Sequence, residues 1–153
     1  MTSWALGHDQ IAQLIARGDL DQVSGEAANG AYLLAQAGQR LTSARTVLAN
    51  DLIGAFELAY DSVRNTAVGL LNQQGLRVKS SGGHAAACDA VRAQFGRDFD
   101  FFNAMRRVRN KLEYPRDPND LQITPAEVQQ AIDYAQSTLL AAEQLLPRLG
   151  IWC

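Results

Sequence analysis

The sequence predicts an all-α fold, an up-and-down antiparallel bundle of four to five helices, because short connections between amphipathic helices imply antiparallel neighbours. Apolar residues recur every three to four positions over long stretches, and no stretch sustains an alternation of apolar and polar residues. Alanine, leucine and glutamine, all good helix formers, are abundant throughout.

The first 25 residues are expected to form a short helix and a linker that pack on the bundle. "HDQIAQLIARG" places Ile11, Leu14 and Ile15 on one face, and Gly18 ends the helix. "DLDQVSG" is expected to be the linker. Residues 26–153 then form the bundle, and the two parts make a single domain.

Two long helices are expected next, over 26–49 and 52–74, with Gly75 as the C-terminal cap of the second. The apolar face of the first consists of Ala27, Ala31, Leu34, Leu41, Ala44 and Leu48. The apolar face of the second consists of Ile53, Phe56, Tyr60, Val63, Ala67 and Leu70.

Apolar spacing and helix start or stop residues predict the three remaining helices. After the loop "GLRVKSSGG", residues 84–95 carry an apolar face of His84, Cys88, Val91 and Phe95. Asp98 is a candidate N-cap for a helix over 99–114, which Pro115 stops because the residue before a proline avoids the α region. "TPAE", with Thr124 as N-cap and Glu127 completing a capping box, starts a last helix that ends near position 146. The core-facing residues of these last two helices are expected to be Phe101, Met105, Val108 and Leu112, then Val128, Ile132, Ala135, Leu139 and Leu146.

Composition excludes several classes of function. The chain has 153 residues, 47% of them hydrophobic and 20% charged, which is typical of one globular domain. A net charge of −2 argues against a general DNA-coating protein, since such binding needs many phosphate contacts. No signal peptide or membrane-spanning segment is recognisable, so we expect a cytoplasmic protein without a membrane partner.

Two cysteines, Cys88 and Cys153, are expected to be a buried structural thiol and a free thiol, although a disulfide between them stays open. No cysteine–histidine spacing indicates a metal site, and no motif indicates a cofactor.

Positive charge is concentrated in "RRVRNKLEYP", at positions 106–115. Its cations have a purely structural explanation, because they complement the C-terminal end of a helix dipole and Arg109 can pair with Glu113. A functional explanation is also open. Arg109 with the amide of Asn110 could bind a phosphate, and Tyr114 could stack on a base. The cations Arg106, Arg107 and Lys111 would add phosphate contacts.

"MRRVRNKLEYP" resembles the last motif of HEPN domains, which are small all-helical bundles of prokaryotic toxin–antitoxin and phage-defence systems. The family motif is an arginine, often followed by a polar residue, and a histidine separated from the arginine by four to six residues; Arg109-Asn110 matches its opening. "AYDSVR" and the Gly-Gly-His start of the next helix are also similar to HEPN sequences, so the resemblance covers about residues 40–146. It implies a homodimer in which paired arginine–histidine sites cleave RNA without a metal.

The sequence departs from this motif at Tyr114, which stands where the family's histidine is expected. A tyrosine is a poor base near neutral pH, because its ordinary pKa is about 10. His84 would replace the missing base if the fold brings it beside Arg109, although a capping or packing role is the simpler expectation for it.

Three functions therefore stay open. The first is an RNA-directed HEPN protein, an endoribonuclease if active, with a degenerate site of Arg109, Asn110 and Tyr114. The second is a non-catalytic HEPN partner, either an antitoxin or the companion of a minimal nucleotidyltransferase that modifies Tyr114. The third is a scaffold bundle whose basic helix end only promotes solubility.

Overall fold

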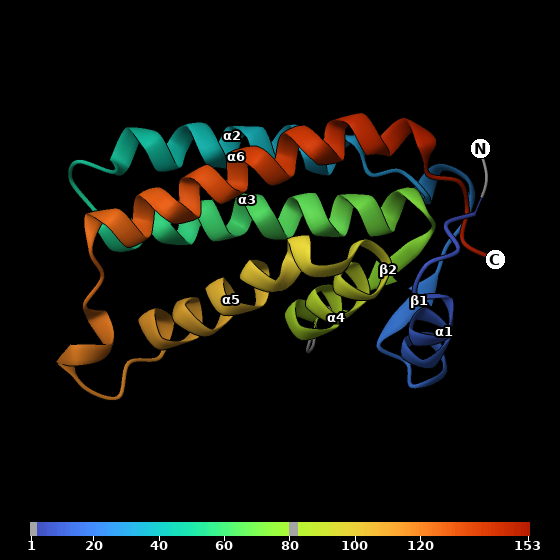
Figure 1. Ribbon diagram of the computed structural model, residues 1–153, viewed down its shortest axis with the longest axis horizontal. Helices are drawn as coiled ribbons and strands as arrows, with labels where there is room; N and C mark the ends of the chain where they lie inside the picture. Colours follow the sequence, from blue (N-terminus) through green and yellow to red (C-terminus); the bar gives the residue numbers. More distant parts are fainter. Residues whose placement is uncertain (1–2, 80–82) are drawn as a thin grey trace.

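The computed structural model describes residues 3–79 and 83–153 and confirms the all-α helical bundle. Three long helices, α2 (Ala31–Val47), α3 (Leu52–Gln73) and α6 (Pro125–Leu145), run side by side, and α4 (Gly83–Phe95) and α5 (Asp100–Glu113) cover a further side of α3 (Figure 1). The shorter α1 (His8–Ala16) lies beside α4 at one end of the bundle. One-turn 3-10 helices occur at η1 (Gly25–Ala27), η2 (Gly96–Phe99), η3 (Pro118–Leu121) and η4 (Leu146–Arg148).

A small antiparallel sheet occupies the segments that the sequence predicts as linker and loop. β1 (Leu20–Gln22) pairs with β2 (Leu76–Val78), with Leu20 opposite Val78 and Gln22 opposite Leu76. Strands of three residues are too short to show an alternating pattern, so periodicity did not reveal them. The pair fixes the N-terminal unit beside the end of α3, since Leu20 and Leu76 are both buried.

The expected helix over 26–49 begins later than predicted, at Ala31. Gly30 explains the boundary: a Cβ there would lie 1.9 Å from the carbonyl oxygen of Gly69, so only glycine allows this contact with α3. The Gly30 N–H also donates to the side chain of Gln73. Consequently Ala27 falls in η1, and both Ala27 and Ala31 are exposed rather than buried.

Asp98 does not cap α5, contrary to the prediction from the sequence. It lies inside η2, and the residue that precedes α5 is Phe99, which makes no side-chain cap hydrogen bond. An N-cap side chain acts from an extended residue, whereas here the chain passes from one helical turn directly into the next. Thr124 behaves as predicted, and both hydrogen bonds of its capping box with Glu127 are present at 3.2 Å.

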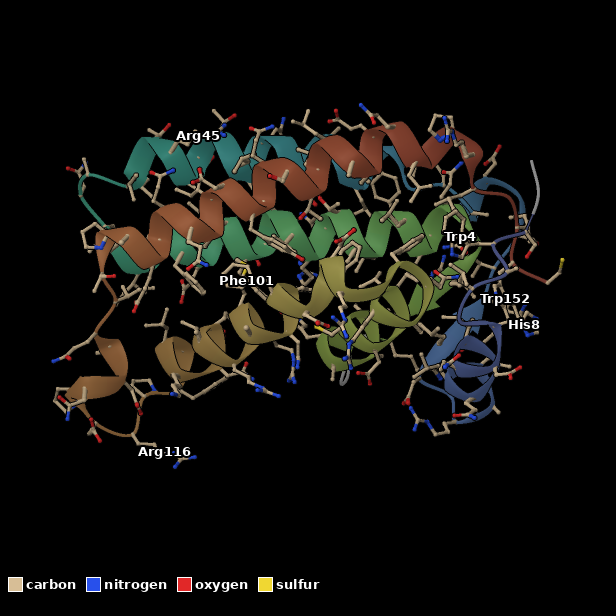
Figure 2. All side chains as sticks on the ribbon, in the orientation of Figure 1. Trp4, His8, Arg45, Phe101, Arg116 and Trp152 are labelled. Atoms are coloured by element: carbon tan, nitrogen blue, oxygen red, sulfur yellow. The ribbon has the colours of Figure 1, made fainter. Side chains whose placement is uncertain are left out.

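A reciprocal pair of buried amides joins α4 to the end of α3. Gln74 and Gln94 exchange side-chain hydrogen bonds of 2.9 and 2.8 Å. Their main-chain carbonyls accept from the two ends of the chain, Gln94 from the Trp4 indole at 2.8 Å and Gln74 from the Trp152 N–H at 3.0 Å. Trp152 also stacks on His8, and all three aromatic side chains lie at the same end of the bundle (Figure 2).

Removal of the α6 cap should lower the stability of the bundle. We expect Thr124→Ala to reduce the free energy of unfolding by about 1 kcal/mol, because the Glu127 N–H loses its acceptor. Urea denaturation measures the change. Thr42→Ala is the matched control, since the Thr42 hydroxyl only donates to the Gly38 carbonyl within α2. Equal losses in the two variants would contradict a special role for the cap.

Candidate functional site

The inward face of α5 contains Arg109 instead of Val108, the neighbouring residue that the sequence predicts for the core. Phe102, Met105 and Leu112 are buried, and Arg109 continues their three-to-four-residue spacing with only 25% of its side chain exposed. Val108, expected in the core, is 38% exposed, and Phe101 is half-buried.

The rotation of α5 about its axis is set by Phe102; Phe101 packs only partly against the core, and the prediction of Val108 as a core residue is wrong. The Phe102 ring packs against the rings of Phe99 and Tyr60, with centroid distances of 6.5 and 5.8 Å. With Phe102 turned inward, Arg109 faces α3 and Val108 turns outward. A half-buried cation at such a position needs partners, because arginine is rarely buried unless it is paired.

Arg109 contacts the buried ring of Tyr60. Its guanidinium carbon lies 5.9 Å from the ring centroid, a cation–π contact, and the Tyr60 side chain is fully buried. Glu113, one turn further along α5, forms an ion pair with the same guanidinium. Arg109 is therefore held between an aromatic face and a carboxylate.

Tyr60 also binds His84, which comes from the start of α4. The phenol oxygen lies 2.7 Å from His84 Nδ1, and the two rings stack with a centroid distance of 5.7 Å. The fold thus places His84 and Arg109 on the same buried tyrosine, although they are 25 positions apart in the sequence (109 minus 84). We name Tyr60, His84 and Arg109 the Tyr60 cluster.

The hydrogen bond between Tyr60 and His84 indicates which imidazole nitrogen carries the proton. A buried hydroxyl needs an acceptor, and Nδ1 is the acceptor that the described residues offer to this phenol. The phenol therefore donates to Nδ1 of a neutral imidazole, which leaves the proton on Nε2. In this state His84 presents a hydrogen-bond donor at Nε2, and its other nitrogen is occupied.

Burial and charge keep His84 neutral. Burial lowers its pKa first, and the guanidinium groups of Arg64 and Arg109 lower it further, while Asp61 and Glu113 act in the opposite direction. Burial likewise raises the pKa of Tyr60, so its phenol stays protonated. The result is a neutral pair of hydrogen-bonded rings between charged groups of α3 and α5.

The remaining residues predicted from the charged segment divide into two groups. Arg106 is half-buried, its Nε donates to Asn103 at 3.1 Å, and it lies beside the buried thiol of Cys88. The other four, which are all exposed, are Arg107, Asn110, Lys111 and Tyr114. Tyr114 is 71% exposed at the C-cap of α5, outside the Tyr60 cluster.

Sequence reasoning missed the role of Tyr60 in the cluster and the proximity of Arg64, whose charge acts on His84. Tyr60 was assigned to the core of α3, and it is indeed buried, but its hydroxyl needed a polar partner that periodicity does not identify. "AYDSVR" placed Tyr60 and Arg64 four residues apart on one helix face, which was the available signal.

Other site types find little support in the described residues. Across 3–79 and 83–153, no three His, Cys, Asp or Glu side chains converge as a metal site would require. Within the same ranges, no helix combines the length and apolar character needed to cross a bilayer. Cys88 is buried and Cys153 is exposed, and both are free thiols.

The pKa of His84 should report the charges around it. We expect His84 to titrate below the ordinary histidine value of about 6.5, and Arg109→Met to raise that pKa because a neighbouring positive charge is removed. The folded state then binds fewer protons than the unfolded state, so stability falls as the pH falls through about 6.5. NMR titration of the imidazole resonances measures the pKa. Arg148→Met, at an exposed position of η4, is the control. An unchanged His84 pKa in Arg109→Met would contradict the assigned contact.

Comparisons of the chain with protein-family models, with curated proteins and with solved structures found no match. The HEPN resemblance thus rests on the sequence motifs, and the site is interpreted from its own geometry.

Proposed function

We propose that this protein is an RNA-directed, HEPN-type bundle of a toxin–antitoxin or phage-defence system, in which Arg109 and His84 bind a phosphate of RNA. The observation that carries the proposal is the placement of Arg109 at a core position of α5, on a tyrosine that also binds His84. A guanidinium and an imidazole N–H are both donors suited to phosphate oxygens. If Arg109 only stabilised the fold, its contact with Tyr60 would not need His84 on the same tyrosine.

The geometry supports binding of RNA better than its cleavage. Attack by a 2′-hydroxyl needs a base. The basic nitrogen of neutral His84 is Nδ1, and its lone pair already accepts a hydrogen bond from the Tyr60 phenol. Tyr114, the residue in the motif's histidine position, is exposed and lies outside the Tyr60 cluster. The cluster therefore supplies donors for a phosphate without an available proton acceptor.

The exposed part of α5 supports contact with a polyanion. Arg107 and Lys111 are exposed on the same helix that carries Arg109, so they can attract the RNA backbone without holding it in one geometry. The homodimer implied by the HEPN resemblance belongs to this proposal, as does a cytoplasmic location.

Loss of the half-buried Arg109 should weaken RNA binding more than loss of the exposed Lys111. We expect Arg109→Met to reduce the affinity for a single-stranded RNA at least about tenfold, because it removes a charge-assisted, forked contact. Lys111→Met should reduce the affinity only about two- to threefold and lower the salt dependence. Fluorescence anisotropy with a labelled oligonucleotide measures both.

Arg148→Met, an exposed position on η4, is the control for a general loss of positive charge. The same RNA incubated with the protein and a chelator should stay intact. Equal affinities of the Arg109→Met and Arg148→Met proteins for RNA would overturn the proposed site. If the wild-type protein cleaves the RNA and Arg109→Met does not, the site is catalytic rather than a binding site alone.

A second candidate function is favoured by the exposure of Tyr114. Its side chain is 71% exposed where α5 ends before Pro115, so an enzyme could reach the phenol without unfolding the bundle. In this alternative the protein is a non-catalytic partner, either an antitoxin or the companion of a minimal nucleotidyltransferase, and Tyr114 is the modified residue. This phenol is a more accessible acceptor than the fully buried Tyr60.

Co-expression with a minimal nucleotidyltransferase should add a nucleotide to Tyr114 if this second function is correct. Intact-mass spectrometry detects the addition, and peptide mapping locates it. Tyr114→Phe should abolish the modification, whereas Tyr32→Phe, which alters another exposed tyrosine, should not. An unmodified wild-type protein that does not co-purify with the enzyme would rule out this role.

A further inference from the structure

The hydrogen-bond donors of Arg64 are not all paired with acceptors among the described residues. Its Nε is buried without a hydrogen-bond partner among the described residues, and the Asp61 carboxylate oxygen lies 4.0 Å from that nitrogen. The side chain as a whole is 33% exposed. A buried guanidinium N–H without an acceptor is costly, so an acceptor supplied from outside the chain would relieve that cost.

Arg64 and Arg109 approach His84 from two different helices. Arg64 follows Tyr60 by four residues on α3, which places both on one helix face, and Arg109 packs on the Tyr60 ring from α5. The two arginines depress the pKa of His84 more than Asp61 and Glu113 raise it. Both cations therefore act on the imidazole in addition to burial, although each arginine has a carboxylate nearby.

Glu113 competes for the donors that an incoming anion would use. It pairs with Arg109 across one turn of α5, and its side chain is partly exposed. Glu57, on the facing side of α3, has a raised pKa, first because of burial and then because of Glu113. An anion that replaces Glu113 at Arg109 would meet a cation on the Tyr60 ring, with the imidazole bound to the same tyrosine and Arg64 one helical turn further along α3.

We propose that Arg64, Arg109 and the Nε2–H of His84 bind one phosphate group together, and that this phosphate displaces Glu113 from Arg109. This inference rests on the proposed function for the source of the phosphate, which is either an internal phosphodiester of RNA or a terminal phosphate. Two guanidinium groups provide paired donors for the oxygens, and Tyr60 orients the imidazole between them. The role of Arg64 is the new element.

Inorganic phosphate is the first probe, because it tests the anion site without RNA. NMR titration of the folded protein should show phosphate raising the pKa of His84 in the wild type, since a bound anion favours the imidazolium. Arg64→Met and Arg109→Met should each weaken phosphate binding at least about tenfold, and Glu113→Gln should strengthen it. Arg64→Lys, which keeps the charge but loses the fork, should bind with intermediate affinity.

The matched control is Arg92→Met, which removes an exposed arginine paired with Asp100 and should leave phosphate binding unchanged. Thermal unfolding of each variant verifies that it is folded. A wild-type His84 resonance that phosphate does not move would overturn the proposal. So would an Arg64→Met protein that is folded and binds phosphate like the wild type.

RNA oligonucleotides separate this inference from the proposed function. If Arg109→Met weakens RNA binding but Arg64→Met does not, the role of Arg64 is wrong and the proposed function stands. If phosphate binds as expected and RNA does not, the anion site stands and the proposed function is wrong. Tighter binding of a 5′-phosphorylated strand than of its 5′-hydroxyl counterpart identifies a terminal phosphate as the ligand, and equal binding identifies an internal one.

Discussion

The buried phenol of Tyr60 is the group on which the arrangement of the site depends. It lies at the middle of α3 without exposure to solvent, and it makes three different contacts: a hydrogen bond to His84, a ring contact with Phe102 and a cation–π contact with Arg109. The Phe102 contact sets the rotation of α5, and that rotation brings Arg109 inward. The phenol oxygen thus fixes the tautomer of the histidine, while the ring of the same residue, through Phe102, fixes the direction of the arginine.

The charges around this tyrosine are balanced within each helix before any ligand binds. Arg109 has Glu113 one turn ahead of it, and Arg64 has Asp61 one turn behind it. Such pairs reduce the cost of half-burying a guanidinium, yet they contribute little net stability because they remain partly exposed to solvent. A site of this kind can exchange an internal carboxylate for an external anion at a small change in free energy.

Much of the fold follows from local signals in the sequence. The apolar periodicity of α3 and α6, the glycine at position 75 and the Thr124 capping box each predict what the structure shows. The β1–β2 pair was missed because its three-residue strands are formed by partners more than 50 positions apart, a tertiary contact without a local pattern. Gly30 was overlooked as a boundary because its contact with Gly69 is also tertiary.

From the sequence, only those site residues could be predicted whose type alone indicates their chemistry. Arg109 and His84 were recognisable as candidates, since a charged side chain near a helix end and a rare histidine are visible in the sequence. Periodicity ranked Val108 above Arg109 for the core because it considers polarity alone. Tyr60 and Arg64 became visible only when three helices were placed together, because their roles depend on partners from α4 and α5.

The contact between the two chain ends has a consequence for protein engineering. The Cys153 N–H donates to the Ser3 hydroxyl, so the described N-terminal segment and the last residue meet at one end of the bundle. The exposed turn around η3 lies toward the opposite end (Figure 1). A circularly permuted chain, joined by a short linker between these ends and opened in that turn, would interrupt none of the α-helices. It would also place the new termini beside the end of α5, where a reporter group attached to either one would sit next to the charged segment.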